Sequence, residues 1–285
     1  MNSPSILAGR DLHAIQQVVK WIVYAILLVN FAGYVIDDLE FAEHGIRDGG
    51  SFLRWTTTFA TTIDELAWFM LLALFELETY ALSDETLKGI TGKVVHGVRI
   101  LCYIFLAHTV YAYYGDVLTY TAAAPLAGIS DLCQLTGQDM SFVYNLVYTV
   151  VDQTSCSTLS VDTVFYPADS ETIVTDTGGI AIARGLAWAD VVEAIIWLII
   201  VLLIELMVRL QGRGVSGGPI MTFGNYAKLA FYGMLFVIAA YWATLQQWLF
   251  VWDEIIWIAG FAIIEMNVVE WRGEMEQEAP APHSA

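Results

Sequence analysis

One helical segment of this chain carries acids inside an apolar run: residues 61–76 read Thr-Thr-Ile-Asp-Glu-Leu-Ala-Trp-Phe-Met-Leu-Leu-Ala-Leu-Phe-Glu. The order is an acid, three residues, Trp, seven residues and Glu. The same order occurs three times, at Asp64/Trp68/Glu76, at Glu193/Trp197/Glu205 and at Asp253/Trp257/Glu265. Each copy lies in a segment long and apolar enough to span a bilayer.

The composition places the chain among membrane proteins that cross the bilayer several times. Hydrophobic residues make up 57% of it and charged residues only 15%, which is too apolar for an ordinary soluble domain. The 30 acids outnumber the 12 bases. This excess argues against nucleic acid and anionic lipid as partners, because both need clustered Lys and Arg. It favours the attraction of cations.

We predict an all-α integral membrane protein with six transmembrane helices arranged as three helical hairpins. The predicted spans are 18–36, 57–80, 97–119, 187–209, 226–247 and 251–271, each long enough for ~30 Å of hydrocarbon. Residues 37–56 are expected to form a loop on the outer side. Nine of the twelve bases fall on one side of these spans, so the positive-inside rule places both termini in the cytoplasm. The protein is then a multi-pass membrane protein, in the inner membrane if the cell is bacterial.

The segments outside the spans predict the domain organisation. We expect an interfacial N-terminal segment at 1–17, helices 1–3 at 18–119, an extracytoplasmic loop subdomain at 120–186, helices 4–6 at 187–271 and a disordered acidic cytoplasmic tail at 272–285. Cys133 and Cys156 lie in the loop subdomain and are expected to form a disulfide there. Alternating residues on either side of Pro167-Ala-Asp-Ser predict a β-hairpin. The third cysteine, Cys102, is expected to be an inert core residue.

The odd-numbered spans suggest an internal repeat. A base precedes a Tyr by four residues in each of them, at Lys20/Tyr24, Arg99/Tyr103 and Lys228/Tyr232. Three hairpins of one type would give pseudo-threefold symmetry within one chain, and internal repeats are common in transport proteins.

An inner layer of carboxylates is predicted toward the cytoplasmic ends of the helices. It consists of Glu76, Glu205 and Glu265, and the bases Lys20, Arg99 and Lys228 lie at the same depth on the partner helices. The main expectation is three structural ion pairs, one per hairpin. The alternative is that the three glutamates act as gate or coupling residues in an ion pathway.

An outer layer of carboxylates lies about 18 Å away, twelve residues along each helix. Its members are Asp64, Glu65, Asp190, Glu193, Asp253 and Glu254. No repeated base lies at this depth, and acids inside a bilayer are costly unless they have a partner or a task. Such a cluster either binds protons or holds cations; the alternative is a solvated rim at the water boundary.

For the repeated Trp residues, His108 and the acids at 37–43, a structural role is the alternative to a functional one. The repeated Trp residues fit packing or an interfacial belt better than a cation–π constriction. His108 is a candidate proton relay, and the alternative is a buried histidine bonded to a neighbouring hydroxyl. The acids at 37–43 could ligate calcium, but their spacing matches no EF-hand, so a solvated face is expected.

The predicted function is translocation of a cation or proton, by a channel or small transporter with an acidic outer vestibule. No cofactor is predicted; a bound cation is compatible with the carboxylates, and the sequence does not define metal ligands. The expected partners are the lipid bilayer and an inorganic cation or proton, with a second copy of the chain or a membrane-complex subunit as further candidates. An enzyme is not expected, because no catalytic motif is present. The alternative function is a non-catalytic accessory or assembly subunit of a larger membrane complex.

Overall fold

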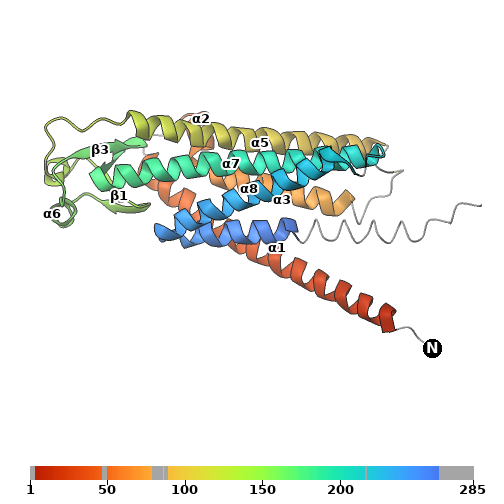
Figure 1. Cartoon of the computed structure of the whole chain (residues 1–285). Coiled ribbons are helices and arrows are strands. Elements are labelled where there is room, and N and C mark those ends of the chain that lie inside the picture. Colours follow the sequence, from red (N-terminus) through yellow and green to blue (C-terminus); the bar gives the residue numbers. More distant parts are fainter. Residues whose placement is uncertain (1–3, 47–49, 79–85, 87–88, 216, 263–285) are drawn as a thin grey trace, which may run out of the picture. The chain divides into compact units, whose positions relative to one another are not determined.

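The computed structural model describes the chain except at residues 1–3, 47–49, 79–85, 87–88, 216 and 263–285 (Figure 1). Two compact units are present: Met1–Ala32 with Tyr232–Ala285, and Gly33–Phe231. Helices make up most of the described chain: α1 Pro4–Gly45, α2 Phe52–Thr58, α3 Ala60–Glu76, α5 Ile90–Ala122, α7 Thr177–Gly212 and α8 Pro219–Thr244. Residues 248–262 are also helical.

Four of these helices are long and apolar enough to cross a membrane, at Gln17–Gly45, Ile90–Ala122, Thr177–Gln211 and Pro219–Thr244. The bent pair α2 and α3 would be a fifth span. Large apolar side chains on them are exposed, including Ile104 on α5 and Leu202 on α7, as expected of helices that face lipid. The protein thus has the character of a multi-pass membrane protein. The sixth predicted span, 251–271, extends beyond the described residues.

The helix boundaries differ from the predicted ones at two places. Residues 37–45 continue α1, so the prediction that the outer loop begins at Asp37 was wrong; no Gly or Pro lies between Gly33 and Gly45 to end the helix there. The predicted span 57–80 is broken, since α2 and α3 meet at a bend of 71°. The predicted interfacial segment 1–17 is continuous with the first span from Pro4 onward.

A small four-stranded sheet corrects the all-α prediction. It belongs to residues 123–176, here called the sheet subdomain. Its strands are β1 Ser141–Tyr144, β2 Val147–Val150, β3 Phe165–Ala168 and β4 Ser170–Asp176, in the order β2-β1-β4-β3. Strands β1 and β4 are parallel, with Phe142 opposite Val174, and the two outer pairs are antiparallel.

Both antiparallel pairs are hairpins closed by residues in the left-handed region. The predicted hairpin is confirmed as β3 and β4, which turn at Asp169 with φ 58°. The hairpin of β1 and β2 was not predicted. It turns at Asn145 and Leu146, with φ of 51° and 67°, as a two-residue type I′ turn requires.

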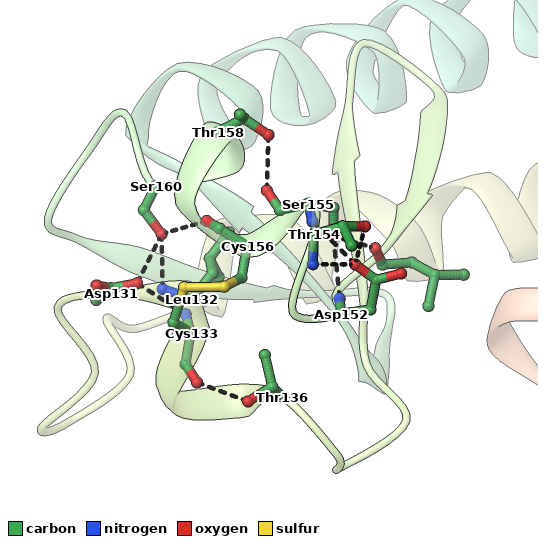
Figure 2. The surroundings of a disulfide bond; sticks show 11 residues. Asp131, Leu132, Cys133, Thr136, Asp152, Thr154, Ser155, Cys156, Thr158 and Ser160 are labelled. Atoms are coloured by element: carbon green, nitrogen blue, oxygen red, sulfur yellow. Dashed lines mark hydrogen bonds between the residues drawn. A yellow bond between two sulfur atoms is a disulfide. The ribbon is translucent and has the colours of Figure 1, made fainter.

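The sheet subdomain has its own core, and a disulfide closes it (Figure 2). Cys133, in the 3-10 helix η2 Leu132–Leu135, is bonded to Cys156 at the start of α6 Cys156–Leu159, with a Cα–Cα distance of 4.9 Å. This confirms the predicted pairing. The buried core residues are Leu132, Leu135, Phe142, Val151, Cys156, Phe165 and Val174.

Polar side chains fold the loops around this core. Oδ1 of Asp131 accepts hydrogen bonds from the backbone N–H of Cys133 at 2.7 Å and from the Ser160 hydroxyl at 3.0 Å. Asp152 accepts from the hydroxyl and backbone N–H of Thr154, both at 2.7 Å. These hydrogen bonds lower the pKa of Asp152 from 3.8 to about 2, because they favour the carboxylate over the acid.

Helix α5 packs against both α3 and α7 within the same unit (Figure 1). Val117 of α5 forms a buried cluster with Ala187 and Val191 of α7. Cys102, also on α5, is free and buried, as predicted. The sheet subdomain is inserted between α5 and α7, and its strands β1, β3 and β4 contact α7. The internal repeat stays a prediction.

Candidate functional site: an acid–tyrosine series

The first turn of α3 makes the contacts on which the site is built. Oγ1 of Thr61 lies 3.1 Å from the hydroxyl of Tyr113 on α5. The backbone N–H of Thr62 donates to Oδ2 of Asp38 on α1 at 2.9 Å. The first N–H groups of a helix have no partner within it, so Asp38 provides one from another helix. The start of α3 is thereby bonded to α1 and α5.

The charges of predicted acids on two helices, α3 and α7, act on Tyr113 of α5. Tyr113 interacts electrostatically with Asp64 of α3 and with Asp190 and Glu193 of α7. The sequence predicts these three acids in one layer, and the charge of each acts on the Tyr113 phenol. The sequence analysis did not identify Tyr113. Its only signal is its position one helical turn before Asp116.

Further titratable side chains connect this group to the sheet subdomain. Asp116 interacts electrostatically with Asp190 and with Asp169 at the β3–β4 turn. Tyr120, one turn further along α5, interacts with the same three acids. We call the whole set the acid–tyrosine series: Asp169, Tyr120, Asp116, Asp190, Tyr113, Asp64 and Glu193. It passes from the sheet subdomain to α3 through neighbouring titratable groups.

A cavity of about 20 Å³ lies at the sheet end of the series. Its walls include Phe41, Tyr120, Tyr148, Asp169 and Leu186. A cavity of this size and polarity can hold one water molecule. Burial raises the pKa of Tyr148 well above that of an ordinary tyrosine, so its phenol keeps its proton at neutral pH and can donate a hydrogen bond.

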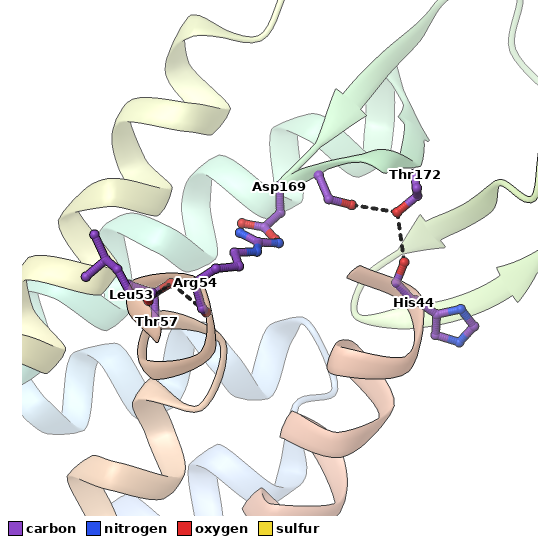
Figure 3. A network of polar contacts seen from close by, with 7 residues as sticks. His44, Leu53, Arg54, Thr57, Asp169 and Thr172 are labelled. Carbon is purple, nitrogen blue, oxygen red and sulfur yellow. Dashed lines mark hydrogen bonds and ion pairs between the residues drawn. The ribbon is translucent and has the colours of Figure 1, made fainter. Parts of the chain in front are cut away.

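Arg54 is the base that accompanies the series (Figure 3). Its Nη2 lies 2.7 Å from Oδ2 of Asp169, and the exposed fractions of the two side chains are 30% and 10%. The guanidinium also lies 5.8 Å from the ring centroid of Phe41. The pair therefore joins the short helix α2 to the turn between β3 and β4. It also balances one of the acids in the series.

Replacing Arg54 by Met is expected to lower the free energy of unfolding by roughly 2 kcal/mol, because it leaves Asp169 poorly solvated and without its base. The partial exposure of Arg54 keeps this below the cost in a fully buried pair. A double-mutant cycle with Asp169→Asn, measured by thermal unfolding, tests it. Additive effects of the two substitutions would mean that the ion pair contributes nothing.

His44 joins the end of α1 to the sheet subdomain. Its Nδ1 lies 2.9 Å from the hydroxyl of Ser141. Its carbonyl accepts a hydrogen bond from the Thr172 hydroxyl at 2.9 Å (Figure 3). Its ring stacks on Tyr148 with centroids 5.1 Å apart. These contacts occupy His44, which lies in the segment 37–56 that was expected to be an outer loop.

In α3, the acid and the Trp of the repeated pattern are hydrogen-bonded to each other. Nε1 of Trp68 donates to Oδ2 of Asp64 at 3.0 Å, one turn apart. The ring of Trp68 packs edge-on against Trp197, with centroids 5.9 Å apart. Both rings are buried. The contacts agree with the packing role expected for these residues.

The third pair of outer acids lies in the other unit. Asp253 and Glu254 are buried, as is Glu65 of α3. Nδ2 of Asn30 donates to Oδ1 of Asp253 at 2.9 Å. Asp253 is one of the predicted outer acids, and the sequence analysis did not predict that Asn30 would bind it. This bond joins α1 to the helix 248–262.

The inner layer is paired differently from the prediction. Arg99 binds Glu78, and Glu205 binds Arg209 on its own helix. The Tyr103 hydroxyl also donates to Glu205 at 3.2 Å. The structure thus assigns Arg99 and Glu205 other partners than each other, and the partner of Glu205 lies one turn away on the same helix.

The remaining inner residues are only partly accounted for. Lys20 is buried, with Nζ 5.8 Å from the ring centroid of Trp21. Glu76 and Lys228 are half-buried. Glu265 lies outside the described residues, so the expected pair of Lys228 and Glu265 stays a prediction.

His108, the predicted relay, binds a backbone group. Its Nε2 lies 3.3 Å from the carbonyl of Thr56 on α2, and its ring stacks on Tyr111 with centroids 6.1 Å apart. The histidine is therefore bonded, as the simpler expectation had it, but to a carbonyl in place of a hydroxyl.

Within the described part of the chain, no group of three His, Cys, Asp or Glu residues is arranged to hold a metal ion. The site consists of carboxyl and hydroxyl groups. In comparisons with known proteins, the chain matches no family model, no curated protein and no solved structure.

Proposed function

We propose that the protein translocates a cation or proton across the membrane, and that the proton is the ion the site serves best. The observation that carries the proposal is that the charges of Asp64, Asp190 and Glu193 all act on Tyr113, whose hydroxyl lies 3.1 Å from Oγ1 of Thr61. Carboxyl and hydroxyl groups within reach of each other can pass a proton by short transfers. Acids held inside a membrane protein commonly belong to such relays.

The sheet end of the acid–tyrosine series supplies the outer access of this path. Asp169 and Tyr120 line a cavity that can hold one water, and both interact electrostatically with Asp116. Protons would pass from this water to Asp116 and Asp190, and then to the group around Tyr113. The excess of acids in the chain, 30 against 12 bases, would raise the local concentration of protons and cations.

Proton flux into liposomes tests the proposal. The purified protein is reconstituted with a pH-sensitive dye inside, and a membrane potential is imposed. Asp64→Asn with Glu193→Gln is expected to reduce the flux by about 100-fold or more, the effect of removing positioned proton-transfer groups. Glu171→Gln is the matched control, because this exposed acid on β4 is not a member of the series.

Two results would contradict the proposal: flux that is unchanged in the double variant, and no proton flux from folded, inserted protein. Na⁺, K⁺ and Ca²⁺ gradients in the same assay show whether another cation is carried. Adding Asp253→Asn then shows whether the third outer acid belongs to the same path.

A second candidate function, an accessory subunit of a membrane complex, is favoured by the surface of the sheet subdomain. Val161 is 88% exposed and Val147 is 66% exposed, and residues 123–176 contain seven acids and no Lys or Arg. Exposed apolar side chains in acidic surroundings suit a docking surface. Under this function, flux is absent from the start, and partners that copurify from native membranes are lost when residues 120–186 are replaced.

A further inference from the structure

The sheet of the sheet subdomain has two edge strands, and they differ in how they are protected. The edge strand β3 contains Pro167, which has no backbone N–H, and its Phe165 carbonyl accepts a hydrogen bond from the N–H of Leu126 at 2.8 Å. Proline and a covering segment are common devices that keep an edge from pairing with another chain. The other edge strand, β2, reads Val-Tyr-Thr-Val, with no proline and no charged residue. It therefore lacks these devices.

The pairing of the β1–β2 hairpin shows which backbone groups of β2 point away from the sheet. The two-residue turn makes Tyr144 and Val147 a hydrogen-bonded pair, and such pairs alternate along antiparallel strands. The intervening residues of β2, Tyr148 and Val150, therefore direct their N–H and C=O groups outward. An added strand would meet these two residues.

Three of the four outward groups are available to a partner. The Val150 carbonyl is occupied, because it accepts a hydrogen bond from the Ser155 hydroxyl at 2.7 Å. The N–H of Val150 and both backbone groups of Tyr148 have no hydrogen-bond partner in the part of the chain that the structure describes. The side chains of Val147 and Val150 are exposed beside them. Peptides that extend a sheet bind to such a row of backbone groups.

The charge beside this edge is negative. An open groove of about 400 Å³ lies at the end of β2, and Val150, Asp139 and Asp152 are among the residues that line it. Both acids are exposed. The sheet subdomain contains seven acids and no Lys or Arg, so the strand that fits this edge carries bases. A second copy of the chain is disfavoured, because its sheet subdomain carries the same seven acids.

We infer that β2 binds an extended, positively charged segment of another protein, which adds a fifth strand to the sheet beside Tyr148 and Val150. The backbone of this segment bonds to the three available groups, and a Lys or Arg near its end is attracted to the acids of the groove. The inference rests on the second candidate function, the accessory subunit, and names the surface and the chemistry of its partner. It does not depend on proton translocation.

A designed peptide tests the edge on the purified full-length protein in detergent. The probe is the capped, fluorescently labelled peptide Lys-Thr-Val-Thr-Val-Lys, and its binding is measured by anisotropy. It is expected to bind about tenfold more tightly than the same peptide with Glu in place of Lys, a difference of about 1.4 kcal/mol. Methylation of its four central backbone nitrogens keeps the charge but prevents strand pairing, and is expected to abolish binding. Hydrogen–deuterium exchange is expected to slow at the amides of Tyr148 and Val150.

Variants of the protein separate backbone pairing from charge. Val150→Pro removes an outward N–H without removing a bond to β1, and is expected to weaken binding by about tenfold, the effect of one hydrogen bond. Val150→Thr keeps the N–H and is expected to leave the affinity unchanged. Asp139→Asn suits the left-handed conformation of this position, φ 56°, and is expected to weaken binding by about threefold. Glu171→Gln is its control. If Val150→Pro does not fold, the methylated peptide still decides the question.

The inference is overturned if the Lys peptide does not bind, or if the Glu peptide or the methylated peptide binds equally well. It is also overturned if the protein is a dimer in detergent that Val150→Pro converts to a monomer, since a second copy would then occupy the edge. Partners that copurify and are lost when residues 120–186 are replaced are a separate result. If they are found while the peptide does not bind, the accessory function stands and the edge site does not.

Discussion

Replacing Phe165 by alanine is expected to lower the free energy of unfolding of the sheet subdomain by roughly 3–5 kcal/mol, the usual cost of removing a buried aromatic side chain. Phe165 is fully buried in the seven-residue core, so the cavity left behind has few neighbours that can fill it. Hydrogen–deuterium exchange of residues 123–176 measures the effect as faster exchange of the sheet amides.

The control for this prediction is Val161→Ala. Val161 lies in the same subdomain but is 88% exposed, so its loss is expected to change stability by less than about 0.5 kcal/mol. Equal exchange in the two variants would show that Phe165 is not part of a cooperative core. The proton flux of Phe165→Ala is then informative as well. Flux that falls with the sheet would place Asp169 and its cavity on the path.

Removing the disulfide is expected to destabilise the same subdomain by about 3 kcal/mol. Cys133 and Cys156 are separated by 23 residues, and the bond restricts the unfolded loop between them. Cys133→Ser with Cys156→Ser is compared with the parent protein by the same amide exchange, with and without reductant. Reductant is expected to affect only the parent.

Cys102→Ala serves as the control for thiol chemistry, because Cys102 is free and buried on α5. It is expected to leave the exchange of residues 123–176 unchanged. A double serine variant as protected as the parent would show that the core alone holds the sheet subdomain together.

The membrane character and the disulfide could be predicted from the chain because each depends on local or compositional signals. Apolar runs of bilayer length identify spanning helices without any tertiary information. Two cysteines in one polar loop have few alternatives to pairing with each other. The β3–β4 hairpin was predicted from alternation around a turn, while the hairpin turning at Asn145 and Leu146 was missed. Its central residues are not the usual Asn-Gly pair.

The members of the site were predicted less completely than its location. Asp64, Asp190 and Glu193 stand out because acids are rare in apolar helices. Tyr113 does not stand out, because tyrosine is common near membrane interfaces. Nor did the pattern predict that Asp38 would receive the N–H of Thr62, since the break at Phe59 has no Gly or Pro to announce it.

The sequence by itself determined the class of protein, the apolar helices, the cysteine pair and the rarity of acids at bilayer depth. Only the tertiary structure decided which polar groups interact: the charges of three carboxylates act on Tyr113, Arg54 pairs with Asp169, and Asp38 accepts a hydrogen bond from the start of α3. The physical reason is one of range. Hydropathy and helix propensity act along neighbouring residues, whereas hydrogen bonds and ion pairs depend on which helix faces pack together, and many packings satisfy the same apolar pattern.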